Sequence, residues 1–307
     1  DKVKNIPIKT PFFSEKRIIH RQWWKSHEKN AMMTLLSIPV TDQEGSETFM
    51  AINKAMRAAL KALSYPDIGI KKNYKVEREL VNLTSKRIIK PHLYRVWDHD
   101  IPCGDHLVPV RIFAPPDGPN HPILIFFHGG GWVTGNIDSY DGVCADMAHL
   151  TRRMVVSVDY RLAPEYKFPA APEDCYAVAR EIYLNDSLLG ARPEEIALIG
   201  DSAGGNLAAA VSLMARDRGE FLPAKQILIY PATAADHSET SPFPSVHENG
   251  TDYLLTSKRV CDYMDLYRSG DEDLHNPYFA PLQAADFRDQ PDTLIITAEY
   301  CPLRDEA

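Results

Sequence analysis

Short apolar runs separated by longer amphipathic stretches dominate the chain from about residue 93 onward. Helices are expected between these runs, notably over Pro172–Leu184 and Asn206–Arg216. The runs that indicate strands are Leu93–Trp97, Val108–Phe113, Pro122–Phe127, Met154–Val158, Ile196–Ile199, Ile227–Tyr230 and Thr293–Thr297. Continuous apolar strands that alternate with helices are typical of a mostly parallel sheet covered by helices on both faces. The pattern therefore predicts an α/β fold over residues 93–307, with the first two strands paired around Pro102–Gly104.

Two segments depart from this alternation. Residues 1–92 contain no strand followed by a Gly-rich turn, but they hold a helical stretch over Glu47–Ser64. Their aromatic clusters are Phe12, Phe13, Trp23 and Trp24. Residues 231–281 interrupt the core with a long polar and aromatic insertion. We expect residues 1–92 to be an N-terminal helical cap region, and the insertion to add a lid over the carboxyl ends of the strands.

Composition narrows the class of protein. A net charge of −8 gives a nucleic-acid partner no electrostatic support. No apolar run approaches the roughly 18 residues that span a bilayer, and residues 1–10 lack the apolar core of a signal peptide. The cysteines have no metal-binding or disulfide spacing: Cys103, Cys144, Cys175, Cys261 and Cys301. These features predict reduced thiols and a cytoplasmic protein.

The first chemical motif is Gly200-Asp201-Ser202-Ala203-Gly204, which follows an apolar strand and precedes an Ala-rich helix. A nucleophile elbow needs this context, because flanking glycines let a tight turn lift the serine hydroxyl out of the fold. The helix that follows adds backbone N–H groups and the positive end of its dipole. Ser202 is therefore the candidate nucleophile, and a chance match in a strand–helix turn is the alternative.

The second motif is His128-Gly129-Gly130-Gly131-Trp132, at the end of another apolar strand. Acyl transfer creates an oxyanion, and the groups that bind it must be fixed before the charge develops. Successive glycines let backbone amides approach that oxygen without a Cβ in the way. We expect the N–H groups of Gly129, Gly130 and Ala203 to form the oxyanion hole. His128 is interpreted as an orienting residue rather than a base.

With these motifs the chain resembles the hormone-sensitive-lipase-like esterases, the HGGG branch of the α/β-hydrolases. The segments that carry the resemblance are His128–Trp132, Tyr160–Glu165 with Phe168–Ala170, Gly200–Gly205, Glu248–Gly250 with Tyr253–Thr256, and Pro302–Glu306. The resemblance implies hydrolysis of small carboxylic esters, usually with short acyl chains, without a metal or cofactor. It also implies a cap built from the N-terminal helices and the insertion, and it suggests a homodimer formed through sheet edges.

The chain departs from the family pattern at the triad acid. The family places its carboxylate just before the Pro-Leu-x-Asp-Glu segment, and this chain has Cys301 there. A thiol is a weak hydrogen-bond partner, so it would hold a catalytic histidine less well than a carboxylate. Asp305 and Asp236 are weaker candidates for the acid. A triad without an acid is favoured over either of them.

The catalytic histidine forms the second departure. The resemblance places it on a loop after one further strand, roughly thirty residues beyond Ala307. Three histidines, His237, His247 and His275, lie in the insertion, and none occupies the family's position. We therefore expect the closing strand and helix of the fold to be missing from this chain.

Two functions from different classes remain open. A serine carboxylesterase would use Ser202, the glycine loop and a histidine base. A binding protein on the same fold would keep the pocket without turnover, as do plant hormone receptors related to this family that have lost a triad member. Cys301 keeps the second reading open, whereas a purely structural role has no feature in its favour.

Overall fold

Seven strands form one sheet in the order β1-β2-β4-β3-β5-β6-β7. They are β1 (Arg95–Cys103), β2 (His106–Ala114), β3 (Ile123–Phe127), β4 (Met154–Val158), β5 (Ile196–Asp201), β6 (Lys225–Ile229) and β7 (Asp292–Ile296). Neighbours from β4 through to β7 pair in parallel, whereas β2 is antiparallel to both β1 and β4. The predicted mostly parallel sheet is confirmed.

This computed structural model describes residues 54–64, 69–85, 95–116, 118 and 121–307. Residues 60–307 form one compact unit, which contains the whole sheet. The N-terminal aromatic clusters and most of the region 1–92 lie outside the described residues. Of the helix expected over Glu47–Ser64, the part after residue 53 is described, and it is helical.

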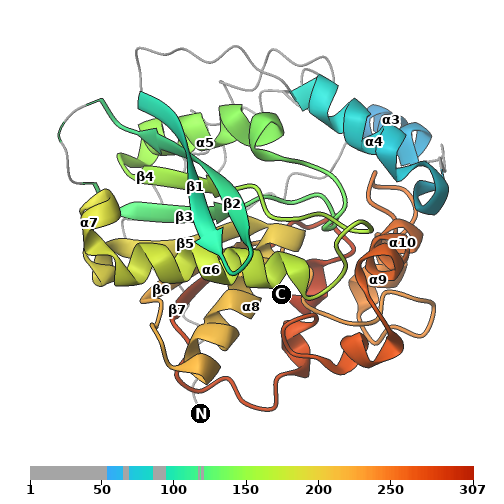
Figure 1. Cartoon of the computed structure of the whole chain (residues 1–307). Helices are drawn as coiled ribbons and strands as arrows, with labels where there is room; N and C mark the ends of the chain where they lie inside the picture. The colour runs from blue at the N-terminus through green and yellow to red at the C-terminus, as the bar shows by residue number, and fades with distance from the viewer. Residues whose placement is uncertain (1–53, 65–68, 86–94, 117, 119–120) are drawn as a thin grey trace, which may run out of the picture. The chain divides into compact units, whose positions relative to one another are not determined.

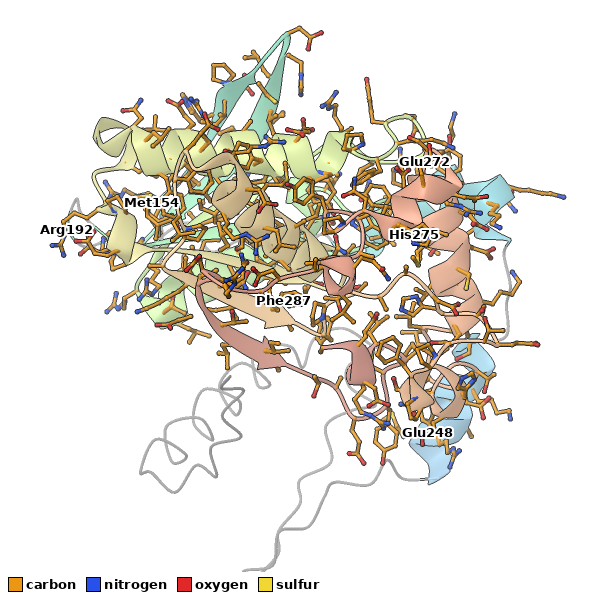
Figure 2. All side chains as sticks on the ribbon, turned by 90° about the horizontal axis from the view of Figure 1, so that it is seen from below. Met154, Arg192, Glu248, Glu272, His275 and Phe287 are labelled. Carbon is orange, nitrogen blue, oxygen red and sulfur yellow. The ribbon has the colours of Figure 1, made fainter. Side chains whose placement is uncertain are left out.

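The helices of the described chain are α3 (Lys54–Ser64), α4 (Ile70–Ser85), α5 (Ile137–Thr151), α6 (Ala170–Leu184), α7 (Asp186–Leu189), α8 (Ala203–Arg218), α9 (Pro244–Glu248) and α10 (Ser257–Tyr267). Four short 3-10 turns accompany them: η1 (Pro193–Glu195), η2 (Asp271–His275), η3 (Pro281–Gln283) and η4 (Arg304–Glu306). The insertion expected over residues 231–281 contains α9, α10 and η2. Figure 2 labels Glu248, Glu272 and His275 of this segment, which lies beside the sheet rather than within it.

Helices cover both faces of the sheet, because alternate side chains of each strand point to opposite faces. On one face Leu124 and Phe126 of β3 pack with Ala145 of α5. On the other face Ile125 and Phe127 pack in the larger core to which α6 and α8 contribute. Figure 1 shows α5 and α6 on opposite sides of the strands. All five residues of β3 are buried, as its unbroken apolar run requires.

The sheet order brings two distant motifs together. β3 and β5 are parallel neighbours, with Phe127 opposite Gly200. Since parallel strands end at the same edge of a sheet, the glycine loop after β3 and the Ser202 turn after β5 emerge side by side. This is the edge at which open α/β sheets bind ligands.

Several elements differ from the expectation. β1 and β2 are longer than their apolar cores, and their turn is Gly104–Asp105 rather than the residues around Pro102–Gly104. α5 was not singled out, because its apolar residues are small and its start depends on an Asn136–Ser139 capping box. At the sheet edge, large apolar side chains of β7 are exposed: 49% for Leu294, 44% for Ile295 and 45% for Ile296.

Asn206 joins the first turn of α8 to two loops. Its side-chain amide donates to the carbonyl oxygens of Ala232 (2.7 Å) and Phe279 (2.8 Å), and the residue is fully buried. A buried carbonyl without a donor costs free energy, so this one side chain fixes both loops beneath the Ser202 turn.

We predict that Asn206→Ala lowers the free energy of unfolding by about 2–4 kcal/mol, because two buried carbonyl groups lose their donor. Chemical denaturation of both proteins measures the difference. Asn185→Ala at the end of α6 is the matched control, since its side chain bonds Glu181 near the surface and its loss should cost less than about 1 kcal/mol. Equal losses in the two variants would contradict the role given to Asn206.

Candidate active site

Ser202 lies on a tight strand-to-helix turn between β5 and α8. Its backbone angles are φ 55° and ψ −117°, a strained combination for a residue with a side chain. The turn closes only because its flanking residues are glycines. A Cβ on Gly200 would overlap the carbonyl oxygen of Gly204, and a Cβ on Gly204 would overlap that of Phe127. The sequence motif therefore folds as the expected elbow.

Ser202 is partly exposed, and its hydroxyl makes no hydrogen bond to any residue that the structure describes. Its backbone is held firmly: the N–H donates to Ile229 O (2.9 Å), and its carbonyl accepts from Asn206 N (3.0 Å). Thus β6 and α8 fix the main chain while the hydroxyl stays available.

The loop after β3 is bound to this turn by Asp201. The Gly129 amide donates to Asp201 Oδ1 at 2.9 Å, and the Tyr140 hydroxyl of α5 donates to Oδ2 at 3.0 Å. Beyond Gly129 the chain turns sharply, with positive φ at Gly130 (116°) and Gly131 (61°). The carbonyl of Gly130 then accepts from the amides of Val133 and Thr134.

These contacts correct one expected oxyanion donor. The Gly129 N–H already faces the Asp201 carboxylate, so it is not available to an oxyanion. Among the described residues, the amides of Gly130, Gly131 and Ala203 have no hydrogen-bond acceptor. The sequence did not predict that the Gly129 amide is occupied, because the carboxylate that binds it is visible only in three dimensions.

Asp201 is an unusual carboxyl group for its position. Burial raises the pKa of Asp201 to about 6, although its bonds from Tyr140 and the Gly129 amide oppose the rise. Burial, together with the neighbouring Asp201 charge, also raises the pKa of Tyr140 well above its usual value. Asp201 and Tyr140 therefore serve as hydrogen-bond partners that hold the glycine loop rather than as a catalytic acid or base.

His128 supports the glycine loop, and it forms no hydrogen bond with Ser202 among the described residues. It is fully buried, and burial lowers its pKa to about 4, so the ring is neutral. Its Nδ1 lies 2.8 Å from Gly129 O, and the ring stacks on Tyr160 with centroids 4.2 Å apart. The Tyr160 hydroxyl donates to His128 O at 2.7 Å. This geometry agrees with the orienting role expected from the sequence.

Cys301 lies on the loop after β7, where the resemblance placed the triad acid. Burial raises the pKa of its thiol, so the group is uncharged at neutral pH. The two other candidates for the acid have partners of their own. Asp236 accepts from Ser238 and Thr240, and Asp305 accepts from Arg304 and Ser245. Neither carboxylate bonds to Ser202 or to a histidine among the described residues.

A buried pair that the sequence did not reveal holds the end of the described chain. His237 Nε2 lies 2.9 Å from Glu306 Oε1, and both side chains are enclosed. Thr233 also bonds to the Glu306 carbonyl. His237 therefore joins the insertion to η4, and it has no contact with Ser202 in the described chain.

α10 and α4 cover the glycine loop. A Cβ on Gly131 would meet the ring of Tyr263 on α10, so this ring lies directly on the loop. The Tyr263 hydroxyl donates to Glu77 on α4 at 2.9 Å, and Arg259 forms an ion pair with the same carboxylate. These contacts join α4 to α10 of the insertion beside the glycine loop.

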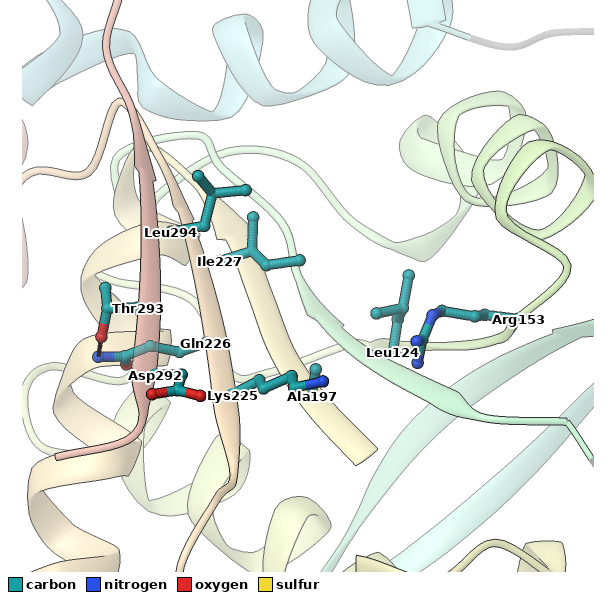
Figure 3. A pocket seen from close by; sticks show the side chains of 9 residues that line it. All are labelled: Leu124, Arg153, Ala197, Lys225, Gln226, Ile227, Asp292, Thr293 and Leu294. Atoms are coloured by element: carbon teal, nitrogen blue, oxygen red, sulfur yellow. Dashed lines mark hydrogen bonds between the residues drawn. The ribbon is translucent and has the colours of Figure 1, made fainter. Parts of the chain in front are cut away.

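Two further features lie away from Ser202. A shallow hollow opens at the amino-terminal ends of β5, β6 and β7, between Ala197, Lys225 and Asp292 (Figure 3). It lies at the opposite end of β5 from Ser202, so it is not the site of acyl chemistry.

Cys103, His106 and Asp174 form the one group in the described chain whose ligand atoms could hold a metal ion.

We predict that Gly130→Ala reduces kcat at least about 10²- to 10³-fold, the range for loss of one oxyanion donor. A Cβ there would overlap the Thr134 carbonyl at a φ of 116°, so the loop must move. Gly219→Ala is the matched control: it also has positive φ, but open space surrounds it at the end of α8. Steady-state kinetics with a nitrophenyl ester measure both, and an unchanged kcat in Gly130→Ala would contradict the assignment.

The raised pKa of Asp201 predicts a particular pH dependence of stability. The folded protein binds the proton of this carboxyl more tightly than the unfolded chain, so wild type gains stability relative to Asp201→Asn as pH falls from about 7 to about 4. Asp305→Asn is the control with the opposite sign, because Arg304 lowers the pKa of Asp305. Denaturation curves across this range measure both differences. Parallel profiles for wild type and Asp201→Asn would contradict the prediction.

Comparison with known proteins agrees with this geometry. The family model described as "alpha/beta hydrolase fold" matches residues 124–307. An arylesterase of Saccharolobus solfataricus is 38% identical over 231 residues, which cover 75% of this chain and 74% of the relative. Esterase LipI of Mycobacterium tuberculosis is 37% identical over 261 residues, covering 83% and 79%.

A solved structure gives the same result for the fold. The hyperthermophilic esterase of the archaeon Pyrobaculum calidifontis superposes with a TM-score of 0.72 at 38% identity, covering 84% of this chain and 83% of that one. No described helix is long and apolar enough to cross a membrane. The order of the strands, the elbow and the relatives lead to one conclusion: the chain belongs to the α/β-hydrolase family, and within it to the hormone-sensitive-lipase-like esterases that its motifs resemble.

Proposed function

We propose that this esterase hydrolyses short-chain carboxylic esters through an acyl-enzyme on Ser202. The observation that carries the proposal is the arrangement of the Ser202 turn beside three amides without an acceptor, those of Gly130, Gly131 and Ala203. Amides fixed before the reaction stabilise negative charge without reorganisation, which is the largest single contribution in many acyl transfers.

The chemistry follows from this arrangement. Ser202 Oγ attacks the ester carbonyl carbon, its proton passes to a base, and the carbonyl oxygen becomes the oxyanion that the three amides receive. Collapse of the tetrahedral intermediate releases the alcohol and leaves an acyl group on Ser202. Water then attacks this acyl group and releases the carboxylic acid. The N-terminal end of α8 adds a positive dipole beside the developing charge.

The proposed site departs from the family pattern at the group that should orient the catalytic base. The family's base is a histidine, and no histidine of the described chain bonds Ser202. In the acid position, the uncharged Cys301 thiol cannot stabilise an imidazolium as a carboxylate does. Replacing a triad carboxylate by a neutral group of similar shape costs about 10⁴-fold in turnover. We therefore infer a slow esterase whose oxyanion hole and nucleophile are intact.

The test compares substitutions at the nucleophile and at the acid position in the full chain, with a nitrophenyl acetate assay. Ser202→Ala should abolish release of nitrophenol. Cys301→Asp should raise kcat, by as much as about 10⁴-fold if the carboxylate is the only missing part. Cys301→Asn is the matched control, since it has nearly the same shape without the charge and should give no gain.

Other outcomes would overturn the proposal. Turnover that persists in Ser202→Ala would exclude the acyl-enzyme. Ligand binding without turnover in wild type and in Cys301→Asp would instead favour a binding protein on the same fold.

A further inference from the structure

The turn between β1 and β2 brings a cysteine and a histidine face to face. Cys103 and His106 are cross-strand partners on either side of Gly104–Asp105. Side chains of directly paired residues project from the same face of an antiparallel ladder. Both side chains reach the fully buried Asp174 of α6. His106 Nε2 lies 2.8 Å from Asp174 Oδ1, and Cys103 Sγ lies 4.0 Å from the same oxygen.

We propose that Cys103, His106 and Asp174, the hairpin site, bind a zinc-class divalent metal ion, independently of ester hydrolysis. Their sulfur, nitrogen and oxygen atoms all lie within 4.8 Å of one another. A tetrahedral zinc ion with these ligands separates its donor atoms by about 3.4 Å. The separations of 2.8 and 4.0 Å bracket that value, so small side-chain movements suffice.

The imidazole of His106 lies between two carboxylates. Its Nδ1 lies 3.3 Å from Asp105 Oδ1 and its Nε2 faces Asp174 Oδ1, so a carboxylate stands at each end of the ring. A neutral imidazole has one N–H and can satisfy only one of them. A metal ion bound between Nε2 and Oδ1 would leave the ring N–H at Nδ1 for Asp105 and satisfy both carboxylates.

Neighbouring side chains orient the proposed metal ligands His106 and Asp174. Asp105 would hold Nδ1 protonated, which leaves the lone pair of Nε2 for the metal, an arrangement common around metal-bound histidines. Arg161 holds Asp174 in place: its backbone N–H and Nε each lie 2.9 Å from Oδ2, and its Nη2 lies 2.8 Å from Oδ1. Arg161 Nε also lies 3.1 Å from Oδ1, so the guanidinium contacts both carboxylate oxygens, and Oδ1 still faces His106 Nε2.

The local charge favours a divalent ion. Burial raises the pKa of the Cys103 thiol, and Asp174, Glu173 and Asp105 raise it further, while Arg161 opposes them. Binding replaces the thiol proton, and any second imidazole proton, by the metal, and these protons pass to solvent. Once the thiolate has formed, the negative charges around the site outnumber the positive charge of Arg161. A divalent ion compensates this excess.

The experiment is a Co²⁺ titration of the untagged full chain after treatment with a chelator, followed by absorption spectroscopy. Co²⁺ in a tetrahedral thiolate site gives a near-ultraviolet charge-transfer band and intense visible bands. We expect both with one equivalent of Co²⁺, and we expect Zn²⁺ to displace Co²⁺ and to raise the Tm.

Variants locate the site. Cys103→Ser should remove the charge-transfer band, and His106→Gln should weaken Co²⁺ binding at least about 100-fold. Cys261→Ser is the matched control, because Cys261 is another half-buried free cysteine, on α10. Retention of the thiolate band in Cys103→Ser, or its loss in Cys261→Ser, would overturn the proposal. So would the absence of a thiolate band in wild type, and circular dichroism of each variant shows whether it has folded.

Discussion

The hydrogen bond between the Gly129 amide and the Asp201 carboxylate is the constraint on which the site depends. It joins the ends of two neighbouring strands, β3 and β5, at 2.9 Å. Because it takes the first amide of the glycine loop, the chain must turn at Gly130 and Gly131, and the next amides are left without acceptors. Asp201 comes directly before Ser202, so the residue that binds the glycine loop also belongs to the Ser202 turn. The two halves of the machinery are thus fixed to each other rather than separately to the scaffold.

Close packing makes this arrangement rigid. The glycines of the elbow leave no space for a side chain between β3, β5 and α8, as Gly204 against Phe127 shows. Strain at Ser202, of order 1–3 kcal/mol for such a conformation, persists because the surrounding strands are fully buried. Above the loop, Tyr263 covers Gly131 and is itself held by Glu77. The glycine loop and the Ser202 turn are therefore preformed, and charged and hydrogen-bonded pairs hold α10 and α4 above them.

Much of the fold could be predicted from the sequence, because buried strands are continuous apolar runs. All seven runs became strands, and Gly200–Gly204 became the turn it indicated. The features that the sequence did not predict depend on contacts between residues that are distant in the sequence. The occupied amide of Gly129 depends on the Asp201 side chain, and the Cys103–His106–Asp174 cluster depends on a hairpin meeting a helix. The hydrophobic pattern did not predict α5, because the buried residues of this helix are small. The sequence position of Cys301 indicated that it replaces the triad acid. Its uncharged state follows from its burial, which the sequence does not reveal.

The structure of a covalent phosphonate adduct would test the central claim most directly, since its phosphoryl oxygen imitates the oxyanion. The geometry predicts a bond from phosphorus to Ser202 Oγ, with the phosphoryl oxygen about 3 Å from the amides of Gly130, Gly131 and Ala203. The Gly129 amide should remain on Asp201. An oxygen bound instead to the Gly129 amide, with Asp201 displaced, or an adduct on another residue, would contradict it.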